Sequence, residues 1–190
     1  MENKVEKSDF LKTVFEWVEL VAFSVACVII ILNCFVRYSP VDGDSMNQTL
    51  QNKDVLILSN LFYEPEVGDI VVFASDNSNG KIGTGYNKPY VKRVIATEGQ
   101  HLVIDNETKT ITVDGKVSEC EKYAYYDPAR MLFVDAYWPD IDIVIPEGQV
   151  FVLGDNRYNS ADSRMLGTVD TRDIIGRVVL RIMPNFGTVE

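Results

Sequence analysis

An uncharged stretch near the N-terminus constrains this 190-residue chain more than any other feature. Residues 20–36 read LVAFSVACVIIILNCFV, and the 17 positions between Glu19 and Arg37 hold no charged side chain. That length is at the lower edge for a helix that crosses a bilayer. Trp17 and Tyr38 flank the stretch 21 positions apart, about 31 Å along a helix, and such aromatic residues favour the headgroup level. The stretch therefore predicts one N-terminal transmembrane helix.

Two other interpretations of this stretch are less favoured. A cleavable signal peptide carries an apolar region of roughly 7–15 residues followed by small residues at the cleavage site, whereas residues 37–40 here read RYSP. A helix in the core of a soluble protein would keep one polar face. Residues 20–36 have none, since Ser24 and Asn33 are their only clear polar interruptions. We therefore expect an uncleaved anchor.

The flanking charges predict the orientation of the anchor. Lys4, Lys7 and Lys12 precede it, and only Arg37 follows it closely. Because positive side chains favour the cytoplasmic side, we expect a single-pass cell-membrane protein with a cytoplasmic N-terminus and an extracytoplasmic body. The expected domains are residues 1–36, the tail and anchor, and residues 37–190, the body.

Composition narrows the chemistry available to the body. The chain has 18 Lys and Arg against 28 Asp and Glu, a net charge of -10, which argues against a nucleic-acid partner. Its single histidine, His101, excludes mechanisms and metal sites that need two histidines. Cys27 and Cys34 fall inside the anchor, so Cys120 has no partner for an intrachain disulfide in the body. We expect neither a metal nor another cofactor.

The body is predicted to be all-β. Short segments rich in β-branched residues alternate with Gly, Asn, Asp and Pro, and only residues 45–51 and 172–175 suggest a helical turn. We therefore expect a β domain tethered to a membrane. The predicted strands cover residues 54–59, 69–73, 90–95, 101–104, 110–113, 141–145, 150–153 and 174–182.

Ser45 is the first candidate for chemistry. It lies in the segment VDGDSMNQTL, residues 41–50, where a turn rich in Gly and Asp precedes a predicted helical turn. Backbone N–H groups at such a turn can stabilise an oxyanion beside a serine nucleophile. Taken alone, however, the segment is better explained by Ser45 as an N-cap.

Lys92 is the second candidate. In the segment YVKRVIA, residues 90–96, strand alternation places Tyr90, Lys92 and Val94 on one face. A lysine among apolar neighbours can have a lowered pKa and take the proton of a serine hydroxyl. The simpler explanation of a lone strand lysine is an exposed side chain.

A charged loop is the third candidate. Residues 154–164 read GDNRYNSADSR and hold two aspartates, two arginines and two serines directly after a predicted strand. Pairs of Asp and Arg can fix such a loop through bidentate hydrogen bonds. This density of opposite charges beside an apolar strand argues against a merely solvated turn.

Taken together and in this order, the segments resemble the bacterial type I signal peptidases, membrane-anchored serine proteases that remove signal peptides from secreted preproteins. The resemblance covers almost the whole chain, and the short body is similar to the compact single-anchor forms of Gram-positive bacteria. It implies a signal-peptidase-like β catalytic domain with a small β insertion at about residues 99–146, preceded by one transmembrane helix. Its motifs are the anchor, Gly43–Met46 with Thr49 and Leu50, Gly68–Phe73, Lys92–Ile95, Gly154–Arg157 and Ser160–Arg164.

The resemblance also implies roles for individual residues. Ser45 would be the nucleophile that forms an acyl-enzyme, Lys92 the general base, and Ser160 the residue that orients the Lys92 amine. The Ser45 N–H would help to bind the oxyanion. The structural pairs would be Asp155 with Arg93 and Asp162 with Arg164. The residues in contact with a preprotein, bound as an added β-strand with small residues near its cleavage site, would be Val41, Asp42, Gly43, Met46, Tyr90 and Val91.

Two positions depart from the family pattern. Gln48 stands where proline is usual, and we expect this change to cost rigidity rather than chemistry. Gly43 stands where some members carry a serine that donates to the oxyanion, so it can offer only its backbone.

Other functions compete with a signal peptidase. A self-cleaving repressor-like Ser–Lys protease would be soluble and would bind DNA, which the anchor and the net charge of -10 disfavour. A membrane-tethered β-domain binding module, an inactive pseudoenzyme or a purely structural domain would have no need of Ser45, Lys92 and Ser160 together.

Overall fold

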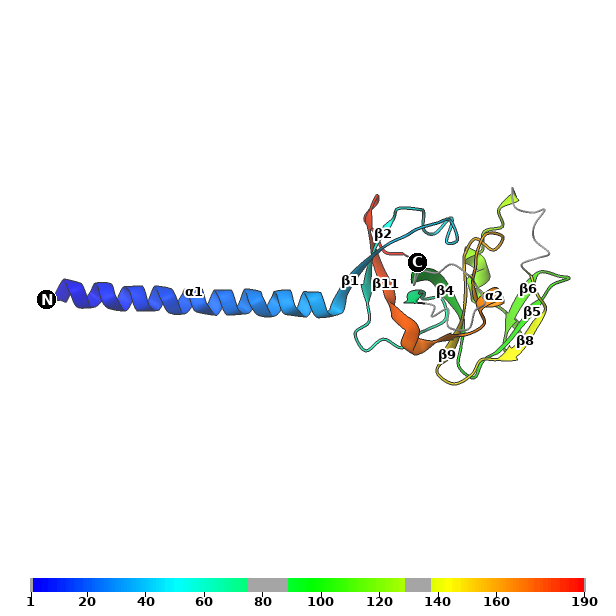
Figure 1. The fold of residues 1–190 in the computed structure, drawn as a ribbon, viewed down its shortest axis with the longest axis horizontal. Coiled ribbons are helices and arrows are strands. Elements are labelled where there is room, and N and C mark those ends of the chain that lie inside the picture. The colour runs from blue at the N-terminus through cyan, green and yellow to red at the C-terminus, as the bar shows by residue number, and fades with distance from the viewer. Residues whose placement is uncertain (1, 75–88, 129–137, 190) are drawn as a thin grey trace. The chain divides into compact units, whose positions relative to one another are not determined.

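The computed structural model describes residues 2–74, 89–128 and 138–189 (Figure 1). The chain divides into two compact units, Met1–Val36 and Arg37–Glu190. The first unit is a single helix, and the second holds two β-sheets.

The helix of the first unit, α1, runs from Glu2 to Phe35. Nearly every side chain described between residues 12 and 30 is exposed, and Phe15 and Phe23 each expose more than half of their surface. A helix that presents apolar side chains on all sides is stable in lipid rather than in water. Among the described residues, Lys12–Ile30 is long and apolar enough to cross a membrane. This window begins earlier than the predicted stretch of residues 20–36.

A seven-stranded sheet forms the larger part of the second unit. Its strands lie in the order β1-β2-β11-β3-β4-β9-β10, and the pairs from β2 to β10 are antiparallel. Strand β4 lies between β3 and β9, and its residues from Val91 to Ala96 are buried. A side chain on either face of β4 is therefore shielded from water. The strands are β1 (Val36–Pro40), β2 (Val55–Ser59), β3 (Ile70–Ala74), β4 (Pro89–Thr97), β9 (Gln149–Leu153), β10 (Val169–Asp170) and β11 (Ile174–Met183).

A four-stranded sheet, in the order β7-β6-β5-β8, lies between β4 and β9 in the sequence. Its buried side chains Leu102, Ile104 and Ile111 pack with Trp138 and with Phe151 of β9. The two sheets therefore share one hydrophobic core, which fixes the second sheet to the strands beside β4. The remaining elements are β5 (His101–Asp105), β6 (Thr110–Val113), β7 (Lys116–Val117), β8 (Ile141–Val144), α2 (Ser163–Leu166) and the 3-10 helices η2 (Glu119–Tyr123) and η4 (Thr171–Asp173).

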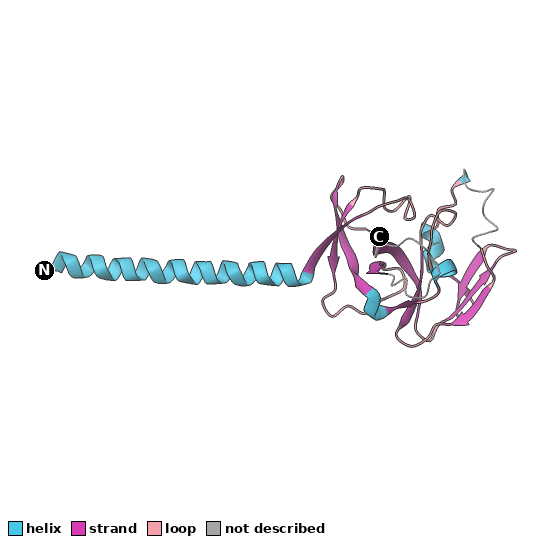
Figure 2. Ribbon diagram, in the orientation of Figure 1, coloured by secondary structure: helices cyan, strands magenta, loops and turns pink. Residues whose placement is uncertain are grey.

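The all-β prediction for the body is confirmed, because strands and loops dominate it and its helices are short (Figure 2). All eight predicted strands are present, and no strand end moves by more than two residues. Strands β7 and β10 were not predicted, because two residues are too few for an alternating pattern. Strand β1 was not predicted either, because it directly continues the apolar stretch.

The helical turn predicted at residues 45–51 is present only as a single turn and does not extend into a helix. The structure has consecutive turns there, with one hydrogen bond of α-helical spacing, from Leu50 N to Met46 O at 2.8 Å. The other predicted turn, at residues 172–175, corresponds to η4. The backbone beside Ser45 is therefore fixed by the contacts described for the site rather than by a helix.

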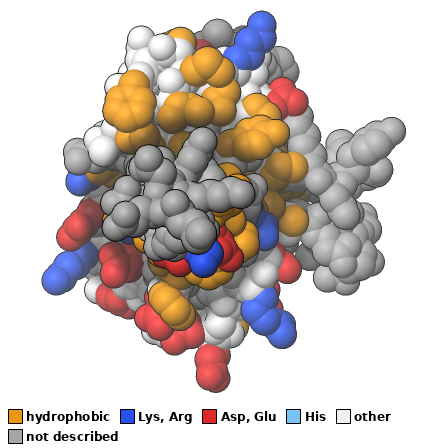
Figure 3. Space-filling model, turned by 90° about the vertical axis from the view of Figure 1, so that its left-hand side faces the viewer, with side chains coloured by type: hydrophobic (Ala, Val, Ile, Leu, Met, Phe, Trp, Pro, Cys, Tyr) orange, Lys and Arg blue, Asp and Glu red, His pale blue; other side chains and the backbone are white. Residues whose placement is uncertain are grey.

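Apolar and acidic side chains are distributed unevenly over the surface of the protein. On the face shown in Figure 3, hydrophobic side chains gather mainly in the upper part and acidic side chains mainly in the lower part. Large apolar side chains of the body that are more than half exposed include Tyr38, Phe62, Met183 and Phe186.

Candidate active site

Ser45 lies beside Lys92 of strand β4. Lys92 Nζ lies 2.7 Å from Ser45 Oγ, within hydrogen-bonding distance, although the residues are 47 positions apart. The same amine donates a hydrogen bond to the carbonyl oxygen of Val91 at 2.8 Å. A neutral amine held this close to a hydroxyl can accept its proton.

Burial alters the acid–base chemistry of Lys92. The residue is only 3% exposed, and it projects from the face of β4 that also carries Tyr90 and Val94. Removal from water lowers the pKa of Lys92 to about 8, against the opposing attraction of Asp162 and Asp155. A substantial fraction of this lysine is therefore neutral near physiological pH.

The carboxylate of Asp155 forms its ion pair with Arg93 rather than with Lys92. Arg93 donates from Nε to Asp155 Oδ1 at 2.9 Å and from its terminal nitrogen to Oδ2 at 2.8 Å. Both side chains are 1% exposed, and the Arg93 guanidinium lies 3.7 Å from the ring centre of Tyr123. This bidentate pair limits the charge that Asp155 presents to the neighbouring lysine.

Asp162 is paired in the same way with Arg164. Arg164 donates to both carboxylate oxygens at 2.8 Å, and the backbone N–H of Gly154 donates to Oδ2 at 3.0 Å. Burial alone would raise the pKa of Asp162, but the charge of Arg164 and these hydrogen bonds hold it below the ordinary value. Both predicted pairs are thus present, and each buried acid has its own cation.

The charged loop, residues 154–164, also forms hydrogen bonds with the segment around Ser45. The sequence analysis did not predict these contacts. The N–H of Asn156 donates to the carbonyl oxygen of Ser45 at 3.0 Å, and its side-chain Nδ2 donates to that of Asp44 at 3.2 Å. Thr49 Oγ1 donates to Asp155 Oδ2 at 2.6 Å. Nothing local in the sequence signals these contacts, because they join segments more than 100 positions apart.

Ser160 lies in this loop without the partner that the resemblance implies. Its Oγ is buried beside Asp162, whose pKa it helps to lower, and it makes no hydrogen bond to Lys92. A Cβ on Gly154 would lie 2.2 Å from this oxygen and 2.5 Å from the carbonyl oxygen of Ser45. Only glycine therefore fits between Ser160 and the nucleophile. The hydrogen bond from Ser160 to Lys92 is not formed in this arrangement.

Ser45 has a free backbone donor for an oxyanion. No residue in the described ranges accepts a hydrogen bond from the Ser45 N–H. Gly43 differs, because its N–H donates to Asn52 Oδ1 at 3.3 Å. Gly43 has a φ of +107°, a backbone conformation that favours glycine. The backbone donor expected from Gly43 is therefore already occupied.

A cleft of about 590 Å³ opens beside the two candidate residues. Five of the six predicted substrate contacts line it, and the exception is Met46, which is 1% exposed. Met46 packs into a hydrophobic core with Leu50 and Val91 instead, because the turn after Ser45 directs it inward. The predicted lining residues are Val41, Asp42, Gly43, Tyr90 and Val91, and those not predicted are Asp44, Pro89, Asn159 and Ala161.

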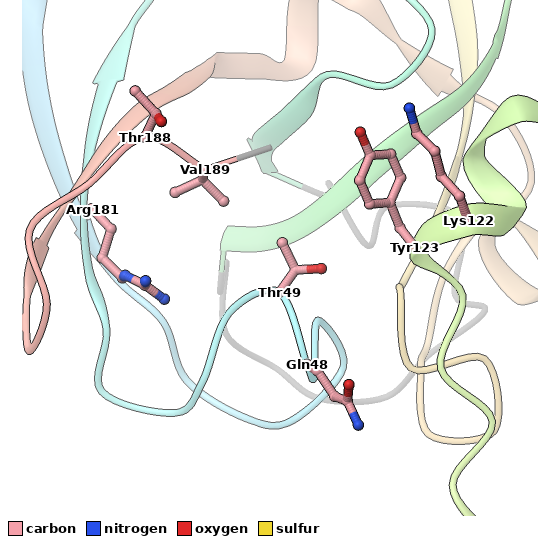
Figure 4. A pocket seen from close by; sticks show the side chains of 7 residues that line it. All are labelled: Gln48, Thr49, Lys122, Tyr123, Arg181, Thr188 and Val189. Atoms are coloured by element: carbon pink, nitrogen blue, oxygen red, sulfur yellow. The ribbon is translucent and has the colours of Figure 1, made fainter.

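A second cavity, of about 290 Å³, borders the turn that carries Thr49 (Figure 4). It contains neither Ser45 nor Lys92. Arg181 extends toward Thr49, whereas the ends of Gln48 and Lys122 point away to opposite sides (Figure 4). Arg181 also pairs with Asp54 at 3.3 Å. The cavity is thus a neighbour of the cleft rather than part of it.

No metal centre is found in the part of the chain that the structure describes. Its His, Cys, Asp and Glu side chains form no group of three or more that would hold an ion.

Comparison with known proteins adds to this geometry. Residues 14–183 match the model of a family described as signal peptidase, peptidase S26. A probable signal peptidase I-1 of Synechocystis is 35% identical over 151 residues, which cover 78% of this chain and 70% of that protein. Signal peptidase IB of Staphylococcus aureus is 30% identical over 186 residues, 91% of each chain. A crystal structure of a signal peptidase I from Enterococcus faecalis covers 60% of this chain and 97% of its own, with 23% identity and a TM-score of 0.41.

Proposed function

The chain belongs to the bacterial type I signal peptidases of the family signal peptidase, peptidase S26, and on that premise we propose that it cleaves secretory preproteins with a Ser45–Lys92 dyad. The observation that carries the dyad is the 2.7 Å separation of Ser45 Oγ and Lys92 Nζ in a buried site. Burial lowers the pKa of Lys92 to about 8, so the neutral form that can act as a base becomes accessible close to neutral pH and grows as the pH rises.

In the proposed acylation step, Ser45 Oγ attacks the carbonyl carbon of the scissile peptide bond while Lys92 Nζ takes the hydroxyl proton. The carbonyl oxygen gains the negative charge, and the Ser45 N–H donates to it. Collapse of this intermediate breaks the C–N bond, and the Lys92 ammonium returns the proton to the departing amine. The signal peptide is then held as an ester of Ser45.

Deacylation uses the same groups. Lys92 takes a proton from a water molecule, whose oxygen attacks the ester carbonyl carbon. The second tetrahedral intermediate expels Ser45 Oγ, which recovers its proton from the Lys92 ammonium. The signal peptide leaves with a new carboxylate, and the enzyme returns to its starting state.

The surrounding residues are proposed to hold this geometry. Arg93 with Asp155 attaches the loop to β4, and Arg164 with Asp162 fixes the loop internally, each through a buried bidentate pair. We assign Ser160 the role of orienting the Lys92 amine. Its buried oxygen can accept a hydrogen bond from the ammonium formed during each half-reaction while its hydroxyl faces Asp162.

The substrate is proposed to be a preprotein with small residues near its cleavage site, bound as an extended strand in the 590 Å³ cleft. Val41, Ala161 and the ring of Tyr90 supply apolar surface there. The exposed apolar surface of α1 supports a membrane anchor. The lysines before the apolar stretch support a cytoplasmic N-terminus, with residues 37–190 as the extracytoplasmic domain and residues 99–146 as its insertion.

A processing assay tests the proposal. Full-length protein in detergent is incubated with a preprotein, and the mature product is quantified. Ser45→Ala and Lys92→Ala should each abolish processing, while Ser59→Ala and Lys116→Ala, which alter the same residue types outside the cleft, should leave it intact. Normal processing by Lys92→Ala would refute the dyad. Binding without cleavage by the wild-type protein would instead indicate a tethered binding module or an inactive pseudoenzyme.

A further inference from the structure

The cleft carries an acidic side chain that the proposed mechanism does not use. Asp44 directly precedes Ser45, lines the cleft and has an exposed side chain. Its backbone carbonyl accepts hydrogen bonds from Asn47 N at 3.1 Å and Asn156 Nδ2 at 3.2 Å. Its carboxylate makes no hydrogen bond or ion pair with any residue in the described ranges. The main chain of Asp44 is thus fixed while its charge is left available.

The described lining of the cleft is more acidic than basic. Among the described residues that line it, Asp42 and Asp44 are acidic and Lys92 is the one basic residue. Lys92 must lose its proton to act as a base, and its charge then no longer offsets the exposed carboxylate of Asp44. The whole chain is acidic as well, with 18 Lys and Arg against 28 Asp and Glu. Such a groove attracts cations and repels anions.

We propose that Asp44 is a specificity-determining residue, which favours preproteins with Lys or Arg close to the scissile bond and disfavours Asp or Glu there. This inference rests on the proposed peptidase function and extends it from the size of the substrate residues to their charge. Because Asp44 is covalently joined to the nucleophile, a peptide whose scissile bond reaches Ser45 carries its flanking residues past this carboxylate. Ion pairs between exposed groups are weak, so the expected preference in kcat/KM is about two- to fivefold.

A charge scan of the substrate tests the proposal. Preproteins that differ only by Lys, Gln or Glu at each position flanking the small residues are compared by kcat/KM with full-length enzyme in detergent. Wild-type enzyme should prefer Lys over Gln and Gln over Glu at one or more positions. Asp44→Asn should bring the Lys-to-Glu ratio close to one, and Asp44→Lys should reverse it. Glu107→Gln, which removes an exposed carboxylate in the turn between β5 and β6, should retain the wild-type ratio.

The salt dependence of the Lys-to-Glu ratio tests the proposal without any variant enzyme. Raising the ionic strength from about 0.05 M to about 0.5 M should shrink the wild-type ratio, because exposed charges are screened. A ratio of one at every position in wild-type enzyme would overturn the charge preference, and an unchanged ratio in Asp44→Asn would overturn its assignment to Asp44. Failure of the wild-type enzyme to cleave the Gln substrate would overturn the peptidase proposal itself. The two failures are therefore distinguishable.

Discussion

Thr49 Oγ1 donates a hydrogen bond of 2.6 Å to Asp155 Oδ2, across 106 positions of sequence. Through this contact the turn that carries Ser45 is tied to the acid that also holds Arg93. Arg93 is adjacent in sequence to Lys92. The segments that carry Ser45 and Lys92 are therefore both hydrogen-bonded to the carboxylate of Asp155. The relationship suggests that Asp155 sets the separation between nucleophile and base.

Replacing the hydroxyl of Thr49 should therefore impair catalysis. Thr49→Val keeps the shape of the side chain but removes the donor to a buried carboxylate, and such a loss costs about 1–3 kcal/mol. We expect kcat to fall roughly tenfold with little change in KM, because the substrate cleft is not lined by this residue. Steady-state kinetics measure kcat and KM separately, and Thr49→Ser should restore kcat. Equal kcat values for Thr49→Val and wild type would remove this link from the mechanism.

The activity should rise with pH as Lys92 loses its proton. Burial lowers the pKa of Lys92 to about 8, so log kcat/KM should increase with a slope near one below that pH and level off above it. The profile is measured with a substrate that lacks groups titrating in this range. A rate that stays constant from about pH 6 to pH 10 would be incompatible with a titrating lysine base.

The same lysine should make folding stability depend on pH. Its pKa falls from 10.5 in the unfolded chain to about 8 in the folded protein, so between these values the unfolded state binds the proton more tightly. The protein therefore gains stability as the pH rises through this window and bears the full cost of the buried charge below it. Lys92→Met should be inactive yet more stable than wild type at pH 7, by on the order of 3 kcal/mol.

Thermal or urea unfolding in detergent at several pH values measures this difference. The advantage of Lys92→Met should shrink above pH 8, the pKa of Lys92 in the folded protein, and vanish near pH 10.5, its pKa in the unfolded chain. Lys116→Met, at an exposed position of β7, is the matched control and should show no such trend. An advantage of equal size at pH 7 and pH 10 would mean that packing rather than charge is responsible.

Gly154 should tolerate no side chain. An added Cβ would come within 2.2 Å of Ser160 Oγ and 2.5 Å of the carbonyl oxygen of Ser45, so Gly154→Ala should destabilise the protein by about 1–3 kcal/mol and suppress processing. Gly187→Ala is the control, because a Cβ there meets no atom within 4 Å. Removing the Ser160 side chain in Gly154→Ala/Ser160→Gly should recover stability only in part, since the contact with Ser45 remains. Unchanged unfolding of Gly154→Ala would show that the loop can move aside.

The sequence predicted the parts of the site that local patterns encode. Strand alternation placed Lys92 on an apolar face, and the density of Asp and Arg after Gly154 predicted that charge pairs fix the loop. The particular pair of Asp162 with Arg164 came from the resemblance to the signal peptidases. The contacts of Thr49 and Asn156 were not predictable, because each depends on how distant strands bring two loops together. The inward course of Met46 was missed for the same reason, since only the packed core distinguishes a buried lining from an open one.

The cavity beside Thr49 borders residues that hold Ser45 and Lys92 in place but does not include the dyad itself. Thr49 and Tyr123 both line it, and these residues contact the two ends of the Asp155–Arg93 pair. A small molecule lodged there would press on the scaffold of the dyad without entering the substrate cleft. Its inhibition would lower kcat and leave KM unchanged, so an abundant preprotein would not displace it.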